Sequence, residues 1–500
     1  MKSIRSSGIL LHITSLPGSF GIGDLGPSAY QFADFLNRSG VAFWQILPIN
    51  HIDPTGGHSP YSALSVFAGD PWLISLEKLC SMGLLQKKDI LASVIPSEDS
   101  VDFQKMTDVK EPLFEKAFKK FCLKDRYRAS FKKFCADQAE WLDSYTIFIS
   151  IRNQLHGKNW WKWPKNLRDR DPSLIRKVQK NLKNDILKEK FLQYIFFRQW
   201  FELKSYCRKK GIRIIGDVPI YVGRDSVDVW AHRRIFSLKK NGIPTAVSGA
   251  PPDYYSRTGQ RWGNPLYRWD VLRKTRYAWW MKRLNHNLKL FDKIRIDHFR
   301  GFVAYWAIPT HHKSARRGKW VKAPARDFLK VVLQKIPKSA IIAEDLGYIT
   351  ADVRKVMDHF GFAGMRLLLF GFGPKFLTHR FAPHNHVRNC VVYTGTHDNN
   401  TAIGWLRQEA TKADRKRLEQ YVAQKVTKDN VASVMRMMAW KSVADLAVVP
   451  IQDVLELGPK ARMNIPATVK GNWVWKLTDL DFAPMVSKML YTELKTCKRI

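Results

Sequence analysis

The chain has 500 residues, of which 45% are hydrophobic and 12% aromatic. This composition supports a large buried core and excludes a globally disordered chain. No apolar run approaches about 20 residues, the length that a membrane-spanning helix needs. The apolar stretch GILLHI near the start is too short for a signal peptide. The six cysteines are scattered without CxxC pairs, which favours reduced thiols, no cysteine metal site and a cytoplasmic location.

The chain is strongly basic, with 83 Lys and Arg against 44 Asp and Glu and a formal charge of +39. Such a charge attracts polyanions, so nucleic acids and anionic membranes have to be considered as partners. No zinc-finger, RNP-type or P-loop pattern accompanies the charge. We therefore interpret it as Lys and Arg on solvated helix faces, and we expect no specific nucleic-acid partner.

Short apolar runs bounded by turn residues predict the strands of a barrel. There are eight, at 7–15, 42–49, 212–222, 293–300, 340–347, 365–372, 390–398 and 448–454. Most gaps hold amphipathic patterns that predict outer helices, such as 28–40, which ends on a capping glycine. Eight strands with intervening helices predict an α/β fold, a closed (β/α)₈ or TIM barrel that spans 1–500 as a single elaborated catalytic domain.

Two long stretches interrupt this alternation. The stretch 80–190 is basic and helix-rich and predicts an inserted helical subdomain, followed by a long helix over 191–211. The stretch 223–290 predicts an inserted loop and helix region over the active site. Within it, 246–269 is rich in Gly, Pro, Ser and aromatic residues and predicts a long ordered loop. Only 500 − 454 = 46 residues follow the last predicted strand, too few for a C-terminal β-sandwich.

Acidic residues follow three of the predicted strands: Asp297 in KIRIDHFRG, Glu344 in AIIAEDLG and Asp398 in VVYTGTHDNN. The carboxyl ends of barrel strands are where such folds assemble a catalytic site. An apolar approach would desolvate Glu344, raise its pKa and keep it protonated, as a general acid needs. Arg295 lies two positions before Asp297, on the same side of the strand, and favours the ionised carboxylate that a nucleophile requires.

Each of these features also has a structural interpretation. Arg295 and Asp297 could form a salt bridge at a strand end, and Asp217 in GDVPIYV could be a turn residue rather than a further acid on the same rim. Asp345 should point away from Glu344, and holds the turn or caps the next helix. A His–Asp pair at His397 could indicate a metal site or a Ser–His–Asp relay, but no HExxH or G-x-S-x-G motif accompanies it.

Together the blocks resemble the amylomaltases, or 4-α-glucanotransferases (disproportionating enzymes), of glycoside hydrolase family 77. The resemblance covers about 6–480 and rests on RIDHFRG, AEDLG, THDN, HSPYS, GDVPIYV, PPDYYSRTGQRWGNPLY and ARMNIPATVKGNWVW, in the family's order. It implies a retaining double displacement that transfers α-1,4-glucan segments between maltodextrins. It implies no metal and no cofactor.

The resemblance also implies roles for individual residues. Asp297 is the expected nucleophile, Glu344 the general acid/base, and Asp398 the carboxylate that stabilises the transition state. The implied substrate-binding residues are Tyr61, Asp217, Asp253, Gln260, Trp262, Arg295, His298, His397 and Asn464. The chain departs from the family pattern at Ala467, where members more often have Gly, and over 371–387, which lacks the usual acidic or Asn-rich character.

Two other functions stay open from the sequence. An α-amylase-like retaining hydrolase would use the same barrel, but such enzymes usually carry the C-terminal β-sandwich for which this chain has no room. A non-catalytic glucan- or polyanion-binding protein would use the basic surface, but would not need the three acids. The sequence does not specify the preferred glucan length, or a monomer or dimer.

Overall fold

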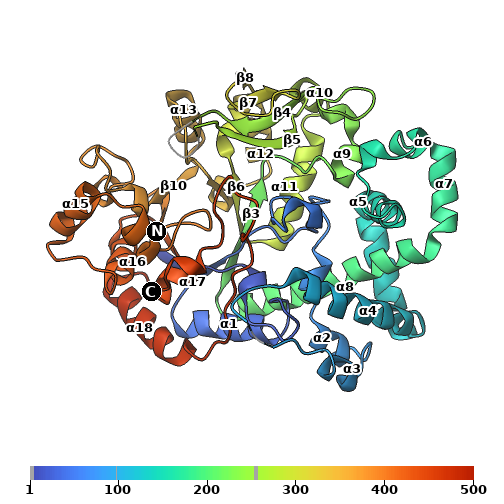
Figure 1. Cartoon of the computed structure of the whole chain (residues 1–500), viewed down its shortest axis with the longest axis horizontal. Coiled ribbons are helices and arrows are strands. Elements are labelled where there is room, and N and C mark those ends of the chain that lie inside the picture. The colour runs from blue at the N-terminus through green and yellow to red at the C-terminus, as the bar shows by residue number, and fades with distance from the viewer. Residues whose placement is uncertain (1–4, 97, 253–256) are drawn as a thin grey trace.

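The computed structural model describes residues 5–96, 98–252 and 257–500. Eight parallel strands close into a barrel in the order β1-β12-β11-β10-β9-β6-β3-β2 (Figure 1). Their bounds are β1 (Ser6–Leu10), β2 (Phe43–Gln45), β3 (Arg213–Pro219), β6 (Lys293–Asp297), β9 (Ile341–Ala343), β10 (Ala363–Leu367), β11 (Cys390–Tyr393) and β12 (Leu446–Pro450). Each predicted run overlaps one of these strands, which confirms the TIM barrel. The last run is wrong in its second half, because 451–454 forms a helical turn.

Side chains on both faces of the strands are buried, which explains why the strands read as continuous apolar runs. All five residues of β12 (LAVVP) are buried, for example. One set of side chains fills the barrel interior, including Leu10, Phe43, Ile215, Ile342, Met365, Val391 and Val448. A second and larger cluster lies between the barrel and its helices and contains Ile9, Trp44, Ile214 and Ile294. Because successive side chains of a strand point to opposite faces, each strand contributes both to the barrel interior and to the layer under the helices.

Helices cover the outside of the barrel. They are α1 (Pro27–Arg38), α8 (Lys183–Lys209), α11 (Ala278–Leu290), α12 (Ala325–Leu333), α13 (Ala351–Phe360), α14 (Ala402–Gln408), α16 (Val431–Lys441), α17 (Ile451–Val454) and α18 (Ala483–Thr496). The helix α15 (Lys412–Val422) lies farther out, at the left of Figure 1. Gly40 follows α1 with φ +70°, as its predicted capping position requires. After β12 the described chain forms no further strand. It returns through α18, which packs on α1.

The chain between β2 and β3 is helical. It contains α2 (Leu76–Ser81), α3 (Lys87–Leu91), α4 (Phe103–Cys122), α5 (Arg128–Gln154), α6 (Lys165–Arg168) and α7 (Pro172–Asn181), followed by α8. These helices extend to the right of the barrel in Figure 1. Because α8 contacts α5 on one side and α1 and β3 on the other, it joins the helices to the barrel. A separate subdomain at 80–190 stays a prediction.

A second sheet lies beside the barrel, partly in a region where the sequence predicts a long loop. Its order is β5-β4-β7-β8, from β4 (Ala246–Ala250), β5 (Gln260–Pro265), β7 (Ala304–Pro309) and β8 (Lys319–Lys322). The loop predicted over 246–269 is therefore wrong at the two segments that form β4 and β5. The sequence misleads because Gly249 is a strand residue: a Cβ there would lie 2.2 Å from the Gln260 carbonyl oxygen, so glycine permits the close approach of β5. The same region also holds α9 (Val227–Ala231) and α10 (Trp269–Lys274).

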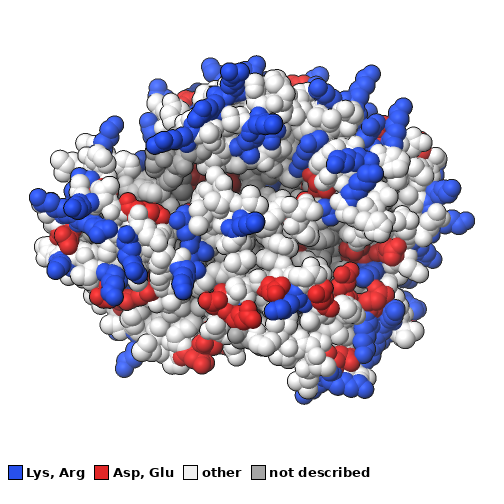
Figure 2. Space-filling model, viewed as in Figure 1, with Lys and Arg blue, Asp and Glu red and all other residues white. Residues whose placement is uncertain are grey.

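Lys and Arg are spread over the face shown in Figure 2 and do not form one block. Acidic residues on this face gather mainly in its lower half. Among the described residues, no helix is long and apolar enough to cross a membrane. Three of the six unpaired cysteines, Cys207, Cys390 and Cys497, are buried.

One buried ion pair joins α4 to the segment that precedes α1. Lys110 of α4 is fully buried, and its Nζ lies 3.0 Å from Asp24 Oδ2. The same ammonium donates to the carbonyl oxygens of Trp72 at 2.7 Å and Ile74 at 2.9 Å. Burial raises the pKa of Asp24 to about 6, although Lys110 opposes this. The lysine thus satisfies three buried or partly buried oxygens.

Replacing Lys110 by Met should lower the free energy of unfolding by about 3–5 kcal/mol at pH 8, because a buried carboxylate loses its partner. Denaturant unfolding measures the change. Lys116→Met is the matched control: Lys116 pairs with Asp89, but its side chain is 56% exposed, so we expect a loss below about 1 kcal/mol. Similar small losses in both variants would contradict a structural role for the buried pair.

Candidate active site

Four acidic side chains gather at the carboxyl ends of the barrel strands. Asp217 and Asp297 lie at the ends of β3 and β6, Glu344 directly follows β9, and Asp398 follows β11 by five residues. Asp297, Glu344 and Asp398 line one cavity of about 650 Å³. Figure 2 shows a hollow in the upper middle of the molecule, below the second sheet of Figure 1. The structure therefore brings together the three carboxyls that the sequence singled out.

Arg295 connects two of the four acids. The parallel register of β3 and β6 places Asp217 opposite Arg295, and strand alternation places Asp297 on the same side. Arg295 Nη2 donates to Asp297 Oδ1 at 2.8 Å, and Nη1 donates to Asp217 Oδ2. Burial alone would lower the pKa of Arg295, but the two carboxylates raise it well above its usual value. A charged guanidinium, with its side chain only 3% exposed, thus braces both acids.

Glu344 lies on the floor of the cavity and is 7% exposed. Burial and the charge of Asp297 raise the pKa of Glu344 to about 8, against the opposing effect of Arg295 and two backbone donors. Those donors are the amides of Leu346 at 2.6 Å and His298 at 2.7 Å. His298 reaches this position with φ +51°, a left-handed conformation uncommon for a residue other than Gly. Glu344 is therefore protonated at neutral pH and fixed in place.

Asp398 has the opposite protonation state. Its Oδ1 accepts a hydrogen bond from Asn464 Nδ2 at 2.6 Å, and its Oδ2 lies 3.3 Å from His397 Nε2. Burial would raise the pKa of Asp398, but His397, Asn464 and Arg295 together hold it well below its usual range. Two carboxyls in one cavity, one protonated and one ionised, can perform different chemistry at the same pH.

Tyr61 connects Asp217 of β3 with His397, which follows β11. Its hydroxyl donates to Asp217 Oδ2 at 2.7 Å and lies 2.8 Å from His397 Nε2. Its ring stacks on His397 with centroids 5.3 Å apart and also contacts Trp473. Tyr61 lines the cavity, so its loop faces the site, whereas Asp217 and His397 support the site from behind.

The second sheet supplies two more of the predicted residues. Trp262 and Gln260 both come from β5, and Trp262 Nε1 donates to Gln260 Oε1 at 3.1 Å. The Trp262 ring meets the His298 ring edge to face, with centroids 4.7 Å apart. Trp262 is 38% exposed at the cavity wall. Asp253, also predicted to bind substrate, lies outside the described residues.

Asp345 points away from the cavity, as strand alternation predicts. It is buried, accepts a hydrogen bond from the Met365 amide at 2.7 Å, and pairs with Arg380 at 2.8 Å. Capping of the next helix by Asp345 is wrong, because α13 has Thr350 as its N-cap residue. Asp345 instead ties β9 to β10.

Several cavity residues were not identified from sequence as site residues. They are Tyr221, Arg300, Trp320, Tyr348 and Trp473. Tyr221, Arg300 and Tyr348 lie within or beside the blocks that carry the acids, and Trp473 lies in the block that carries Asn464. A large side chain within or next to such a block was a signal that could have identified them. Trp320 had no such signal, since only the pairing of β7 with β8 brings it to the cavity.

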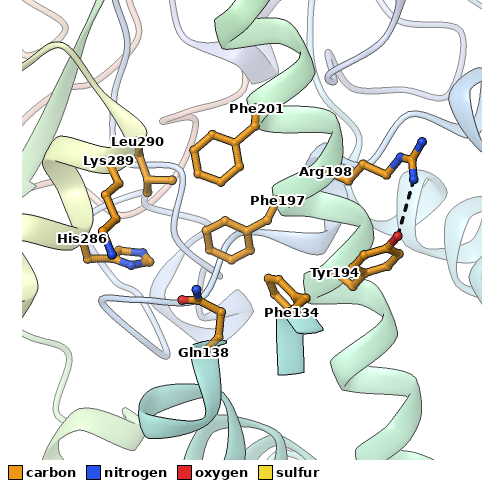
Figure 3. A pocket seen from close by; sticks show the side chains of 9 residues that line it. All are labelled: Phe134, Gln138, Tyr194, Phe197, Arg198, Phe201, His286, Lys289 and Leu290. Carbon is orange, nitrogen blue, oxygen red and sulfur yellow. Dashed lines mark hydrogen bonds between the residues drawn. The ribbon is translucent and has the colours of Figure 1, made fainter. Parts of the chain in front are cut away.

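A smaller cavity of about 200 Å³ lies outside the barrel, where α5, α8 and α11 meet (Figure 3). Its walls are mostly aromatic, with Phe134, Phe197 and Phe201 facing His286 across the space. No carboxyl lines it. Among the described residues, no cluster of three or more His, Cys, Asp or Glu has the arrangement of a metal site. The chemistry therefore belongs to the larger cavity.

A closed (β/α)₈ barrel with paired carboxyls in an aromatic-lined cleft defines a protein of the glycoside-processing class. The 4-alpha-glucanotransferase family profile matches residues 11–481. A 4-alpha-glucanotransferase of Thermus thermophilus is 43% identical over 495 residues, 97% of each chain. One from Clostridium butyricum is 41% identical over 485 residues, 96% of this chain and 98% of the relative. An amylomaltase structure from Streptococcus agalactiae, in complex with acarbose, is 34% identical and superposes with a TM-score of 0.95 over 99% of both chains.

This chain belongs to the 4-alpha-glucanotransferase family. The resemblance read from the sequence blocks is confirmed over nearly the whole length. An amylomaltase from Corynebacterium glutamicum, at 18% identity, shares the fold with a TM-score of 0.80 over 99% of this chain and 75% of its own.

Ala467, where the sequence departs from the family pattern, lines the same cavity with φ +65°, a left-handed conformation that favours glycine. An L-residue in this conformation destabilises the folded state by about 1–2 kcal/mol. Glycine removes this strain, but it loses about 0.5–1 kcal/mol more conformational entropy on folding than alanine does, so only part of the strain energy is recovered. Ala467→Gly should therefore raise the free energy of unfolding by up to about 1 kcal/mol.

Denaturant unfolding checks this prediction. The control is Ala413→Gly, the same chemical change at an exposed position inside α15, which should cost about 1 kcal/mol. A loss of stability in both variants would show that the conformation of Ala467 carries no strain.

Proposed function

We propose that this protein is a 4-α-glucanotransferase that moves α-1,4-glucan segments between maltodextrins by retaining double displacement. Family membership supports the activity. The observation that carries the mechanism is the pairing of a protonated Glu344 with Asp297, which Arg295 holds, in one cleft. A reaction that retains the anomeric configuration requires a proton donor and a carboxylate nucleophile beside the same glycosidic bond.

In the first step, Glu344 donates its proton to the glycosidic oxygen while Asp297 attacks the anomeric carbon. The bond between that carbon and the oxygen breaks, the leaving chain departs with a free 4-hydroxyl, and a covalent glucosyl ester forms on Asp297. Arg295 binds Asp297 Oδ1, so it fixes the attacking carboxylate before the substrate arrives.

The positive charge that develops on the sugar ring requires a fixed anion. Asp398 supplies it, since Asn464 and His397 keep Asp398 ionised and oriented. Burial lowers the pKa of His298 to about 4, so this imidazole is neutral, and its Nε2 has no hydrogen-bond partner among the described residues. We assign that nitrogen to a sugar hydroxyl. Tyr61, Gln260 and Trp262 complete the surroundings of the sugar, and Asp217 acts from behind them by holding the Tyr61 hydroxyl.

In the second step, the ionised Glu344 removes the proton from the 4-hydroxyl of an acceptor sugar. The acceptor oxygen attacks the anomeric carbon, the ester to Asp297 breaks, and a new α-1,4 bond forms. The two carboxyls supply nucleophile and proton, so these steps call for no cofactor. Transfer exceeds hydrolysis when bound acceptor keeps water at a disadvantage. We further propose that the protein acts in the cytoplasm, as its scattered cysteines suggest.

Incubation with maltotriose tests the activity. Transfer predicts glucose together with a ladder of maltodextrins longer than maltotriose, resolved by chromatography. Asp297→Asn should lower the rate by several orders of magnitude while leaving thermal unfolding cooperative, because only the nucleophile is lost. Glucose and maltose without longer products would favour an α-amylase-like hydrolase. Absence of turnover, with salt-dependent binding to DNA, would favour a polyanion-binding protein.

Glu344→Gln tests the acid. Its rate on maltotriose should fall by about 10²–10⁴-fold, whereas formation of the glucosyl-enzyme from α-glucosyl fluoride should persist, because fluoride leaves without a proton. In the unmodified protein, kcat/KM for maltotriose should decline as the pH rises through about 8, where Glu344 loses its proton. Fluoride release should not show this decline. Equal losses on both substrates would contradict the assignment.

A further inference from the structure

Two aromatic rings at the outer part of the cleft have no role in the mechanism above. Trp320 belongs to β8, and Tyr348 lies between β9 and α13. Their ring centroids are 6.1 Å apart and their planes differ by 19°, so the two faces point in nearly the same direction. Both rings line the cavity that holds the carboxyls. Tyr348 is 58% exposed, so an apolar face remains uncovered at the opening.

Arg300 braces this pair. Its guanidinium carbon lies 3.8 Å from the Trp320 ring centroid and 5.4 Å from that of Tyr348. Nη1 donates to Thr350 Oγ1 at 2.9 Å, which anchors the arginine to the start of α13. Arg300 is 5% exposed, and its Nε has no partner among the described residues. The rings are thus held in a fixed orientation before any ligand binds, and a buried donor beside them is unused.

The position of the rings indicates which part of a glucan they meet. Glu344 protonates the bond that breaks, so it marks the boundary between the sugar kept on Asp297 and the leaving chain. Asp398 and its partners come from the segments after β11 and β12, and hold the retained sugar. Tyr348 follows Glu344 by four residues and Arg300 follows Asp297 by three, and both lie beside the second sheet. A chain that leaves Glu344 in this direction passes from the buried floor to the exposed rings.

We propose that Trp320 and Tyr348, braced by Arg300, form a sugar-stacking platform for the acceptor glucan. Flat rings bind sugars by covering their apolar C–H faces, and a fixed pair does so with little loss of conformational freedom. The platform favours maltodextrin acceptors that extend from Glu344 to the opening of the cleft, and it adds nothing to the binding of glucose, which is too short to reach it. This inference rests on the proposed function, because it assigns the acceptor side by the role of Glu344.

The test separates acceptor binding from donor chemistry. With α-glucosyl fluoride as donor, the leaving group is a single ion and does not occupy the platform. Tyr348→Ala should raise KM for maltotriose as acceptor by about fivefold to tenfold, with KM for glucose as acceptor and KM for the donor unchanged. Tyr348→Phe keeps the ring and should stay within about twofold of the unmodified protein. Tyr491→Ala removes a similarly exposed tyrosine from α18, far along the chain from the cleft, and is the matched control.

Unchanged KM for maltotriose in Tyr348→Ala, or an equal rise for glucose and maltotriose, would overturn the platform. If the unmodified protein transfers no glucose from the fluoride, the proposed function fails instead. Calorimetric binding of maltoheptaose then decides the platform by itself: weaker binding by Tyr348→Ala supports it, and equal affinity overturns it.

Discussion

The site depends on one buried cation. Arg295 contacts Asp217 and Asp297 at the ends of two neighbouring strands, where two unshielded carboxylates would repel each other. The same guanidinium favours ionisation of Glu344, yet burial and Asp297 outweigh it. A single guanidinium therefore binds both the nucleophile and its supporting acid, while Glu344 stays protonated. Removing it would leave buried charge without compensation, a far larger effect than loss of a surface ion pair.

The second sheet places one tryptophan at each end of the cleft. In the order β5-β4-β7-β8 the edge strands are β5 and β8, and each carries a tryptophan that lines the cavity. Trp262 on β5 meets His298 beside the reacting sugar, and Trp320 on β8 meets Tyr348 at the opening. The width of this small sheet thus sets the spacing between the reacting centre and the outer rings. A loop of equal length would not hold the two tryptophans at a fixed separation.

Much of this arrangement could be predicted from the sequence, for a physical reason. Barrel strands are buried on both faces and are therefore visible in the sequence as apolar runs, and acidic residues at or just after the ends of such runs are candidates for the site. That logic located Asp297, Glu344 and Asp398. It failed for β4 and β5, where Gly249 and neighbouring prolines resemble a loop, although β4 pairs with β5 and with β7, which lies beyond residue 300. It also failed for Trp320, whose place depends on pairing between distant segments that no local pattern encodes.

The barrel closes between its first and last strands, since Ser6 to Leu10 pair with Leu446 to Pro450. Arg499 reinforces the seam by donating to the Ser6 carbonyl oxygen at 2.8 Å. During synthesis, therefore, this edge of β1 stays unpaired until residues 446–450 have left the ribosome. Asn464, which orients Asp398, emerges after that closing strand. A translation product that stops before β12 thus has neither a closed barrel nor the residue that orients Asp398, and one that stops between β12 and Asn464 has all eight strands but lacks that residue.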